Sequence, residues 1–409
     1  MVVAFFVFFA APWRPLRLRA VDRKSAKEVP LRRKKTRAKS ETSPLPNCEG
    51  ILKNYKIAVI EGDGIGREVV SEGIRVLEGA GRRFDLSFAW QPFDWSCERY
   101  LKTGRMMPED GLDQLRSFDA IYLGAVGYPG VPDHISLWGL LIPIRRGFQQ
   151  YVCVRPARLL QGITTPLSGR KAGDIDFIIV RENNEGEYSE VGGRMNRNTD
   201  FDMAIQQSIF TRRGCDRIIT YAFELARTRK KHVTSATKSN GIVYSMPFWD
   251  ERFAAISKKY PDIKTDQYHI DILTAHFVAH PDWFDVVVGS NLFGDILSDL
   301  GAAVVGSMGL APSANLNPER EYPSLFEPVH GSAPDIAGKG IANPVAQIWS
   351  GAMMLGHLGE KQAAHAIEQA IFKVLAHSDV RTRDIGGNAS TGEMGEVIAA
   401  ELSTVAVAR

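Results

Sequence analysis

The chain has 409 residues, of which 44% are hydrophobic and 24% are charged. These values are typical of a globular protein and exclude collagen-like, coiled-coil and wholly disordered chains, and the length suggests about two or three domains. No apolar run reaches the ~18 residues of a membrane span, so no membrane partner is expected. The four cysteines form no CxxC pair, which favours a reducing, cytoplasmic location.

The net charge of +3 hides an asymmetry. Residues 1–54 contain 13 Lys/Arg against 4 Asp/Glu, a net charge of +9, so the rest of the chain carries −6. The mildly acidic body gives no reason to expect a nucleic acid partner. We expect residues 1–54 to be a disordered extension, with a mitochondrial targeting segment and a basic nucleic-acid-binding arm as alternatives.

Short apolar runs alternate with helical patterns along the rest of the chain. The runs predict buried strands at 56–60, 120–124, 177–180, 232–235 and 285–289. Helical periodicity predicts helices after residue 66, at 218–227 and at 270–278. This alternation predicts an α/β fold with a largely buried sheet core.

A glycine-rich turn follows the first predicted strand. Its glycines, Gly62, Gly64 and Gly66, are followed by Arg67. The GxGxG spacing lacks the third glycine position of the dinucleotide fingerprint GxGxxG. The sequence therefore predicts that this is not a classical Rossmann domain.

Three arginines are candidates for binding an anionic substrate. Arg145 lies in an Arg-Arg pair, and Arg155 and Arg181 lie at the edges of apolar segments, where a buried charge needs a partner. Guanidinium groups bind carboxylates through paired hydrogen bonds, so the set would suit a small dianionic acid. Ordinary surface ion pairs are the alternative interpretation.

Three aspartates are candidates for binding a metal. The Gly294-Asp295 pair predicts a helix that begins near Asp295, which would place Asp295 and Asp299 on one face, and Asp271 lies among apolar residues. Carboxylates in apolar segments need a cation or a hydrogen-bond network, and three hard oxygen ligands suit Mg²⁺ or Mn²⁺. Helix capping with salt bridges is the alternative.

Two further side chains could exchange protons with a substrate. Lys238 follows a predicted strand, and Tyr188 follows the strand that carries Arg181. A Lys beside other cations can serve as a base, and a Tyr can serve as an acid. Taken alone, a lysine is more often solvated and a tyrosine is more often a packing residue. A second loop rich in small residues, 327–344, could approach a flat ligand closely.

Together these segments resemble the β-decarboxylating dehydrogenase family, which includes isocitrate, 3-isopropylmalate, tartrate and D-malate dehydrogenases. The motifs EGDGIG (61–66), NLFGDILSDLGAAVVGSMGL (291–310) and EPVHGSAPDIAGKGIANP (327–344) carry the resemblance. It implies the isopropylmalate dehydrogenase-like fold with two α/β domains. Residues 55–150 plus 306–409 would form the large cofactor-binding domain. Residues 151–305 would form the small domain with the substrate and metal site and the dimer interface.

The resemblance also implies roles for individual residues. It assigns Arg145, Arg155 and Arg181 to the substrate, Tyr188 and Lys238 to acid–base chemistry, and Asp271, Asp295 and Asp299 to the metal. The adenosine-binding loop would comprise His330, Gly331, Ser332, Ala333, Asp335, Ile336 and Asn343. An acid at position 335 implies NAD rather than NADP, because it would repel a 2′-phosphate. Family sites are shared across a homodimer, so Lys238 and Asp271 would serve the partner's site.

The subfamily depends on the segment before Arg145. Isopropylmalate enzymes have an acid and leucines there, whereas this chain has Trp138 and one extra residue. The pattern is similar to tartrate and D-malate dehydrogenases, and Trp138 would close the pocket around a small C3 group. The expected reaction is oxidation, with decarboxylation, of a (2R)-2-hydroxy dicarboxylate. 3-Isopropylmalate dehydrogenase is the alternative within the family, and a phosphoryl-transfer hydrolase and a nucleic acid binder are alternatives outside it.

Overall fold

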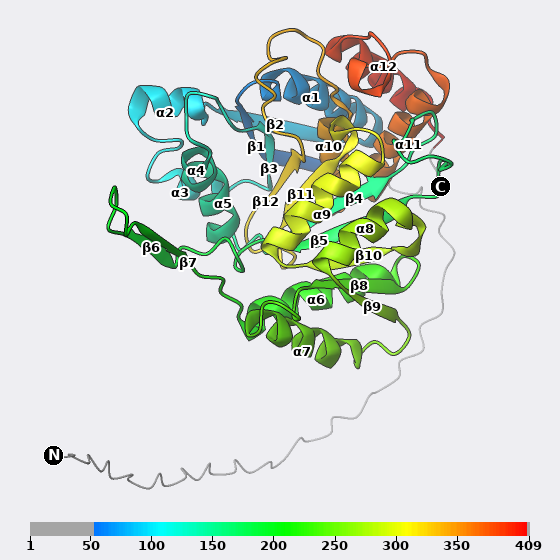
Figure 1. Ribbon diagram of the computed structural model, residues 1–409. Helices are drawn as coiled ribbons and strands as arrows, with labels where there is room; N and C mark the ends of the chain where they lie inside the picture. Colours follow the sequence, from blue (N-terminus) through cyan, green and yellow to red (C-terminus); the bar gives the residue numbers. More distant parts are fainter. Residues whose placement is uncertain (1–52, 407–409) are drawn as a thin grey trace, which may run out of the picture. The chain divides into compact units, whose positions relative to one another are not determined.

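The computed structural model describes residues 53–406 (Figure 1). The expectations for the N-terminal extension therefore fall almost entirely outside the described residues. Lys53 and Asn54 already belong to the first strand, so the ordered body begins earlier than the predicted boundary at residue 55. No helix among residues 53–406 is long and apolar enough to cross a membrane.

A single ten-stranded sheet organises the body. Its strands, in chain order, are β1 (Lys53–Gly62), β2 (Leu86–Phe93), β3 (Ala120–Ala125), β4 (Val152–Arg158), β5 (Asp176–Glu182), β8 (His232–Thr237), β9 (Lys264–His269), β10 (Val286–Gly289), β11 (Pro312–Leu316) and β12 (Ser324–Pro328). The longer helices are α1 (Gly66–Phe84), α6 (Arg212–Arg227), α7 (Ser245–Ser257), α8 (Ile270–Ala279), α9 (Asn291–Val304), α10 (Val345–Leu358), α11 (Lys361–His377) and α12 (Thr391–Thr404). The shorter helical segments are α2 (Cys97–Thr103), α3 (Gly111–Leu115), α4 (Asp133–Ser136), η1 (Leu137–Leu141), α5 (Ile142–Gly147), η2 (Pro281–Trp283), η3 (Met308–Leu310) and η4 (Arg383–Ile385).

The sheet has two parallel halves joined by antiparallel strands. Its order is β2-β1-β3-β12-β11-β4-β5-β10-β8-β9, and pairing is antiparallel only from β12 through β11 and β4 to β5. The first five strands in this order come from the predicted large domain and the last five from the predicted small domain. The division into two domains stays a prediction, because the sheet continues across the line between them.

The predicted α/β fold with a sheet core is confirmed. Strands overlap all five apolar runs, and the helices predicted at 218–227 and 270–278 lie within α6 and α8. The sequence patterns missed five strands of the sheet, β2, β4, β9, β11 and β12. Strands β4, β11 and β12 are buried, but polar residues or prolines interrupt their apolar residues. Strands β2 and β9 form the two edges of the sheet and carry many exposed residues. An edge strand contacts the core on one side only, so its sequence lacks a continuous apolar run.

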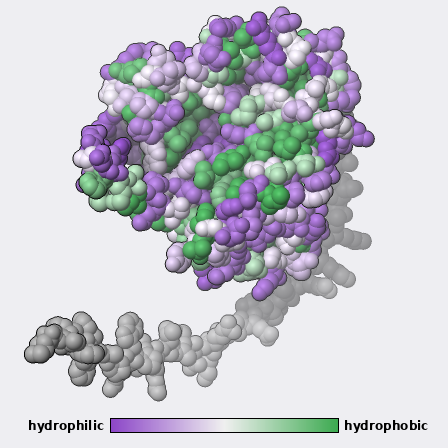
Figure 2. Space-filling view, in the orientation of Figure 1, coloured by the Kyte–Doolittle hydropathy of each residue, from purple (hydrophilic) through white to green (hydrophobic). Residues whose placement is uncertain are grey.

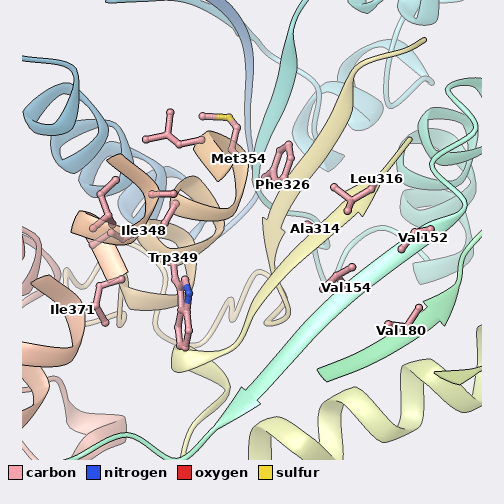
Figure 3. Close-up of a cluster of buried hydrophobic side chains, with 14 of the residues drawn as sticks. Val152, Val154, Val180, Ala314, Leu316, Phe326, Ile348, Trp349, Met354 and Ile371 are labelled. Atoms are coloured by element: carbon pink, nitrogen blue, oxygen red, sulfur yellow. The ribbon is translucent and has the colours of Figure 1, made fainter. Parts of the chain in front are cut away.

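Helices cover both halves of the sheet (Figure 1). Helices α1, α10, α11 and α12 pack against one another over the first half, and the pairs α6–α7 and α8–α9 contact the strands of the second half. A large apolar cluster spans the joining strands, where Val154 of β4, Ala314 of β11 and Trp349 of α10 belong to the same core (Figure 3). The strands that carry the candidate site are therefore held in a well-packed frame.

One small element lies outside this frame. Strands β6 (Gly192–Met195) and β7 (Met203–Gln206) form a two-stranded hairpin, and all eight strand residues are exposed. Met195, Met203 and Ile205 on the hairpin, with Phe201 in its turn, expose much of their apolar side chains. An isolated hairpin is marginally stable in water, so this one is suited to packing against another surface.

Candidate active site

The first glycine-rich turn is held in place by hydrogen bonds to the rest of the protein. The buried Asp63 carboxylate accepts hydrogen bonds from the backbone N–H of Cys97 at 3.0 Å and of Gly127 at 3.0 Å. The Ile65 N–H donates to the Ser332 carbonyl at 2.9 Å. These contacts fix the turn and join it to the second glycine-rich loop.

The three candidate arginines are all buried. Arg145 on α5 forms an ion pair of 2.7 Å with Glu327 at the end of β12. Arg155 on β4 donates from Nη1 to Ser298 at 2.7 Å and to Asp295 at 3.1 Å. They lie within or next to the sheet, and are not the surface ion pairs of the alternative interpretation.

Arg181 on β5 is the most buried of the three, with a residue exposure of 2%. Its guanidinium donates to the Asn291 side chain at 2.7 and 3.0 Å and forms an ion pair with Asp295. Burial lowers the pKa of Arg181, and the Asp295 carboxylate opposes that shift. A buried guanidinium is tolerated here because side chains of α9 satisfy its donors.

Helix α9 carries two of the candidate metal ligands. It begins at Asn291, because the Ser290 hydroxyl caps it by accepting from Phe293 N–H, and not near Asp295 as predicted. The earlier start leaves Asp295 and Asp299 one turn apart on the same face. The prediction of a shared face is therefore met, although the predicted helix start was wrong.

The two carboxylates have different surroundings. Burial acts to raise the pKa of Asp295, but Arg181 and Arg155 outweigh it and hold that pKa below its usual value. Desolvation raises the pKa of Asp299, and Arg155, 3.8 Å away, offsets this only partly. Among residues 53–406 no group donates a hydrogen bond to Asp299, so its carboxylate remains available to a ligand.

Tyr188 lies against the same cluster. Its hydroxyl donates to Asp295 Oδ2 at 2.8 Å, and the Arg181 guanidinium lies 5.4 Å from the centre of its ring. Burial, followed by the negative charge of Asp295, raises the pKa of Tyr188 to about 12. The tyrosine is therefore protonated at neutral pH, as a proton donor must be.

Lys238 and Asp271 form a separate group. Lys238, just after β8, forms an ion pair of 2.9 Å with Asp271 in the first turn of α8, and this hydrogen bond lowers the pKa of Asp271. Within the described part of the chain, no hydrogen bond or ion pair links these two residues to the arginine cluster. Nor does that part contain a set of three acidic, His or Cys side chains placed to bind a metal.

Trp138 lies in an unusual helical turn. The residues from Leu137 to Leu141 form a π-helix, in which the Ile142 N–H donates to the Leu137 carbonyl five residues earlier. A π-turn holds one more residue than an α-turn and is common at functional sites. This turn provides a place for the extra residue before Arg145. The ring of Trp138 lies 4.9 Å from the guanidinium carbon of Arg146.

The second glycine-rich loop borders a cavity of about 360 Å³. Its lining includes Ile65 from the first turn and His330, Ala333, Ile336 and Asn343 from the candidate cofactor residues. Ser332 is buried by its contact with the first turn, whereas Gly331 and Asp335 are exposed. The structure thus brings the predicted cofactor residues together around two adjoining loops.

His330 shows an unmet hydrogen-bonding capacity in this cavity. Its Nε2 is buried and has no hydrogen-bond partner within residues 53–406, while Nδ1 lies 3.0 Å from the Gly331 carbonyl. Burial lowers the pKa of His330, which keeps the ring neutral. Buried polar atoms are normally paired, so this atom is suited to a bound ligand.

Sequence reasoning missed several residues that hold the site. Glu327 pairs with Arg145 and also accepts from Asn315 at 2.7 Å, and Asn291 and Ser298 satisfy the other arginines. The requirement that buried charges be paired predicts that such partners exist. It does not say which residues they are, because the partners are more than a hundred positions apart in the chain.

Comparison with known proteins shows the family of this chain. Residues 56–398 match the family described as isocitrate/isopropylmalate dehydrogenase. D-malate dehydrogenase (decarboxylating) of Escherichia coli K12 is 58% identical over 85% of this chain and 98% of its own. Tartrate dehydrogenase/decarboxylase of Pseudomonas putida is 58% identical over 86% and 98%.

A solved structure of the same family has the same fold. The crystal structure of isocitrate dehydrogenase from Methylococcus capsulatus superposes with a TM-score of 0.77 at 36% identity, over 85% of this chain and 99% of that one. The isopropylmalate dehydrogenase-like fold is thereby confirmed. The chain belongs to the isocitrate/isopropylmalate dehydrogenase family and is an oxidoreductase of that decarboxylating family.

Proposed function

We propose that this protein oxidises and decarboxylates a small (2R)-2-hydroxy dicarboxylate, D-malate or tartrate, with NAD and a divalent metal. The observation that carries the proposal is the convergence of the buried Arg155 and Arg181 and the partly buried Tyr188 on Asp295. A cationic cluster buried beside a protonated phenol suits a dianionic acid. The names of the two relatives at 58% identity support the same substrate class.

The arginines would bind and orient the substrate. Arg155 and Arg181 are both paired with Asp295, and Arg145 is paired with Glu327. Each guanidinium has further donors that can meet the substrate's carboxylates in a fork-like geometry. Fixing both carboxylates would place the C2 hydroxyl in one orientation, which lowers the entropic part of the barrier.

Two side chains would move protons. Lys238 would accept the proton of the C2 hydroxyl, and Tyr188 would donate a proton to the carbon that loses CO₂. Tyr188 keeps its proton at neutral pH because burial and Asp295 raise its pKa to about 12. A base and an acid with separate surroundings can perform the two transfers in sequence.

The aspartates fit a hard divalent cation, Mg²⁺ or Mn²⁺, only if two copies of the chain contribute. Asp295 and Asp299 share one face of α9, and the Asp299 carboxylate accepts no hydrogen bond within residues 53–406. Asp271 of a second copy would complete the set. When bound, the cation would withdraw electron density from the substrate's oxygen atoms.

The cavity beside the two glycine-rich loops fits the adenosine part of NAD. Buried His330 Nε2 offers an unpaired nitrogen, and the exposed Asp335 carboxylate would accept from ribose hydroxyls. A negative charge at Asp335 would repel the 2′-phosphate of NADP. When bound, NAD⁺ would accept the hydride from C2.

We also propose a homodimer with shared active sites. Exposed apolar side chains gather on α8 and α9, including Ile272, Val278 and Ile296, and Figure 2 shows apolar atoms across this region and on the β6–β7 hairpin. Patches of this kind mark interaction surfaces. The separation of Lys238 and Asp271 from the arginine cluster agrees with a site completed by a second copy.

The proposal includes no nucleic acid partner and no membrane partner, and it places the activity in the cell. The acidic body gives no reason to expect nucleic acid or membrane partners. We place the activity in the cytoplasm, with the mitochondrion as the alternative if residues 1–54 act as a targeting segment.

The test compares substrates directly. The full chain is incubated with Mn²⁺ and NAD⁺, and NADH formation is followed by absorbance with D-malate, (+)-tartrate and 3-isopropylmalate. We expect turnover of D-malate and tartrate, and little of 3-isopropylmalate. Turnover mainly of 3-isopropylmalate would refute the proposal in favour of the leucine-pathway reaction.

A further inference from the structure

Arg146 joins two segments of the site that are distant in the chain. Its guanidinium carbon lies 4.9 Å from the centre of the Trp138 ring, and its Nη2 donates to the backbone carbonyl of Tyr188. Its Nη1 forms an ion pair of 3.1 Å with Glu190. One side chain therefore contacts both the π-turn before α5 and the loop that follows β5.

The contacts of Arg146 differ in how strongly they fix its position. Glu190 is 72% exposed, so solvent screens its ion pair with Arg146 and the pair contributes little. Arg146 itself is 26% exposed, and its planar group can stack on an aromatic ring while donating hydrogen bonds from its edge. The stack on Trp138 and the bond to the Tyr188 carbonyl are the contacts that define geometry.

Trp138 lies where the helix departs from α-helical geometry. It lies in the π-turn from Leu137 to Leu141, where backbone hydrogen bonds follow the five-residue pattern. Such turns are rare and often occur at functional sites. Arg146 contacts the ring in this turn directly through its guanidinium group.

We propose that Arg146 is a positioning residue that sets substrate selectivity at C3, because it holds Trp138 as the wall of the substrate pocket. The inference rests on the proposed function and on the expectation, from the family resemblance, that Trp138 faces the C3 substituent. The bond to the Tyr188 carbonyl ties this wall to the candidate proton donor. Loosening the wall would admit a larger group at C3 while leaving the arginine cluster in place.

The experiment measures kcat and KM for D-malate and 3-isopropylmalate in four proteins and a control. The four are the wild type, Arg146→Met, Trp138→Ala and the double variant. The matched control is Arg158→Met, because Arg158 lies 4.9 Å from the ring centre of Phe372, the same distance as in the Arg146–Trp138 pair. Arg158 lies at the end of β4 and belongs to no candidate binding or catalytic group.

The readout is the ratio of kcat/KM for 3-isopropylmalate to that for D-malate. Arg146→Met should raise this ratio about fivefold, the size of a partly exposed cation–π contact. Trp138→Ala should raise it about tenfold or more. The double variant should match Trp138→Ala, because Arg146 acts on the ratio through Trp138, and Arg158→Met should leave the ratio unchanged. A general loss of protein stability, or a displacement of Tyr188, would lower kcat/KM for both substrates by the same factor and leave the ratio unchanged.

Two results would overturn the inference while leaving the proposed function intact. One is an unchanged ratio in Arg146→Met when the wild type is selective for D-malate. The other is a double variant whose ratio is the product of the two single effects. A wild type that prefers 3-isopropylmalate would instead overturn the proposed function, and this result is read without any variant.

Discussion

The buried pair between Arg145 and Glu327 gives a stability prediction with a clear magnitude. Both side chains are about 7% exposed, their charged atoms lie 2.7 Å apart, and Glu327 also accepts from Asn315. Glu327→Ala would leave the Arg145 charge uncompensated and the Asn315 amide without its acceptor. Removing one partner of a buried pair costs about 3–5 kcal/mol, so the free energy of unfolding should fall by about that amount.

The assay is urea unfolding followed by far-UV circular dichroism, at one fixed protein concentration because dimerisation would couple stability to concentration. Glu327→Gln should cost less than Glu327→Ala, since its amide oxygen still accepts a hydrogen bond. The matched control is Glu98→Ala, which removes two exposed ion pairs, one of 2.6 Å with Arg67 and one of 2.8 Å with Lys102; the three side chains are 50–69% exposed. That change should have little effect.

The two substitutions differ in the burial of the ion pairs that they remove, whereas the contact distances are nearly the same. Equal midpoints for Glu327→Ala and the wild type would refute the reasoning. So would a loss in Glu98→Ala as large as that in Glu327→Ala, because solvent screening would then not distinguish the two sites.

Three further predictions follow from the described contacts. Lys238→Met should remove most of kcat without changing the circular dichroism spectrum, and near-wild-type turnover would exclude Lys238 as the base. Gly64→Ala should weaken NAD⁺ binding measured by calorimetry, because residue 64 has a φ of +56° and a Cβ there would lie 2.0 Å from the Ser332 carbonyl oxygen; unchanged affinity would contradict this. Burial lowers the pKa of His357 from 6.5 to about 4. Above about pH 6.5 His357 is neutral in both the folded and the unfolded state and has no effect on the pH dependence of stability. Between pH 6.5 and 4 only the unfolded state takes up the proton, so the free energy of unfolding falls by about 3 kcal/mol. His357→Gln should flatten this part of the pH–stability curve, and a curve as steep as the wild type's would show that another group is responsible.

The parts of the fold and site predicted from sequence are those encoded by short local patterns. Buried strands such as β3 and β10 consist of continuous apolar runs. Asp295 lies in the motif 291–310, and the family resemblance that this motif carries also implied the roles of Arg155 and Lys238. The spacing of Gly62, Gly64 and Gly66 also argued against a Rossmann turn, and the family match agrees with a different α/β fold.

The rest depends on contacts between distant positions or on competing local signals. The start of α9 was predicted near Asp295 because Gly294-Asp295 resembles a helix start. Ser290 provides the stronger cap, since its hydroxyl accepts from Phe293 N–H and donates to Glu187 at 2.7 Å. The pairing of Arg145 with Glu327 crosses 182 positions, and no local pattern signals it.

The order of strands in the sheet also has a consequence for synthesis on the ribosome. Strands β4, β5, β8, β9 and β10 come from one continuous stretch, 152–289, so their half of the sheet can form as soon as that stretch emerges. Strand β3 cannot pair with β12 until the chain beyond Ser324 has been synthesised, and β4 cannot pair with β11 until the chain beyond Pro312 has been synthesised. Until then both strands present unpaired edges that favour aggregation. We therefore expect nascent chains stalled before Pro312 to need chaperones far more than the finished protein does.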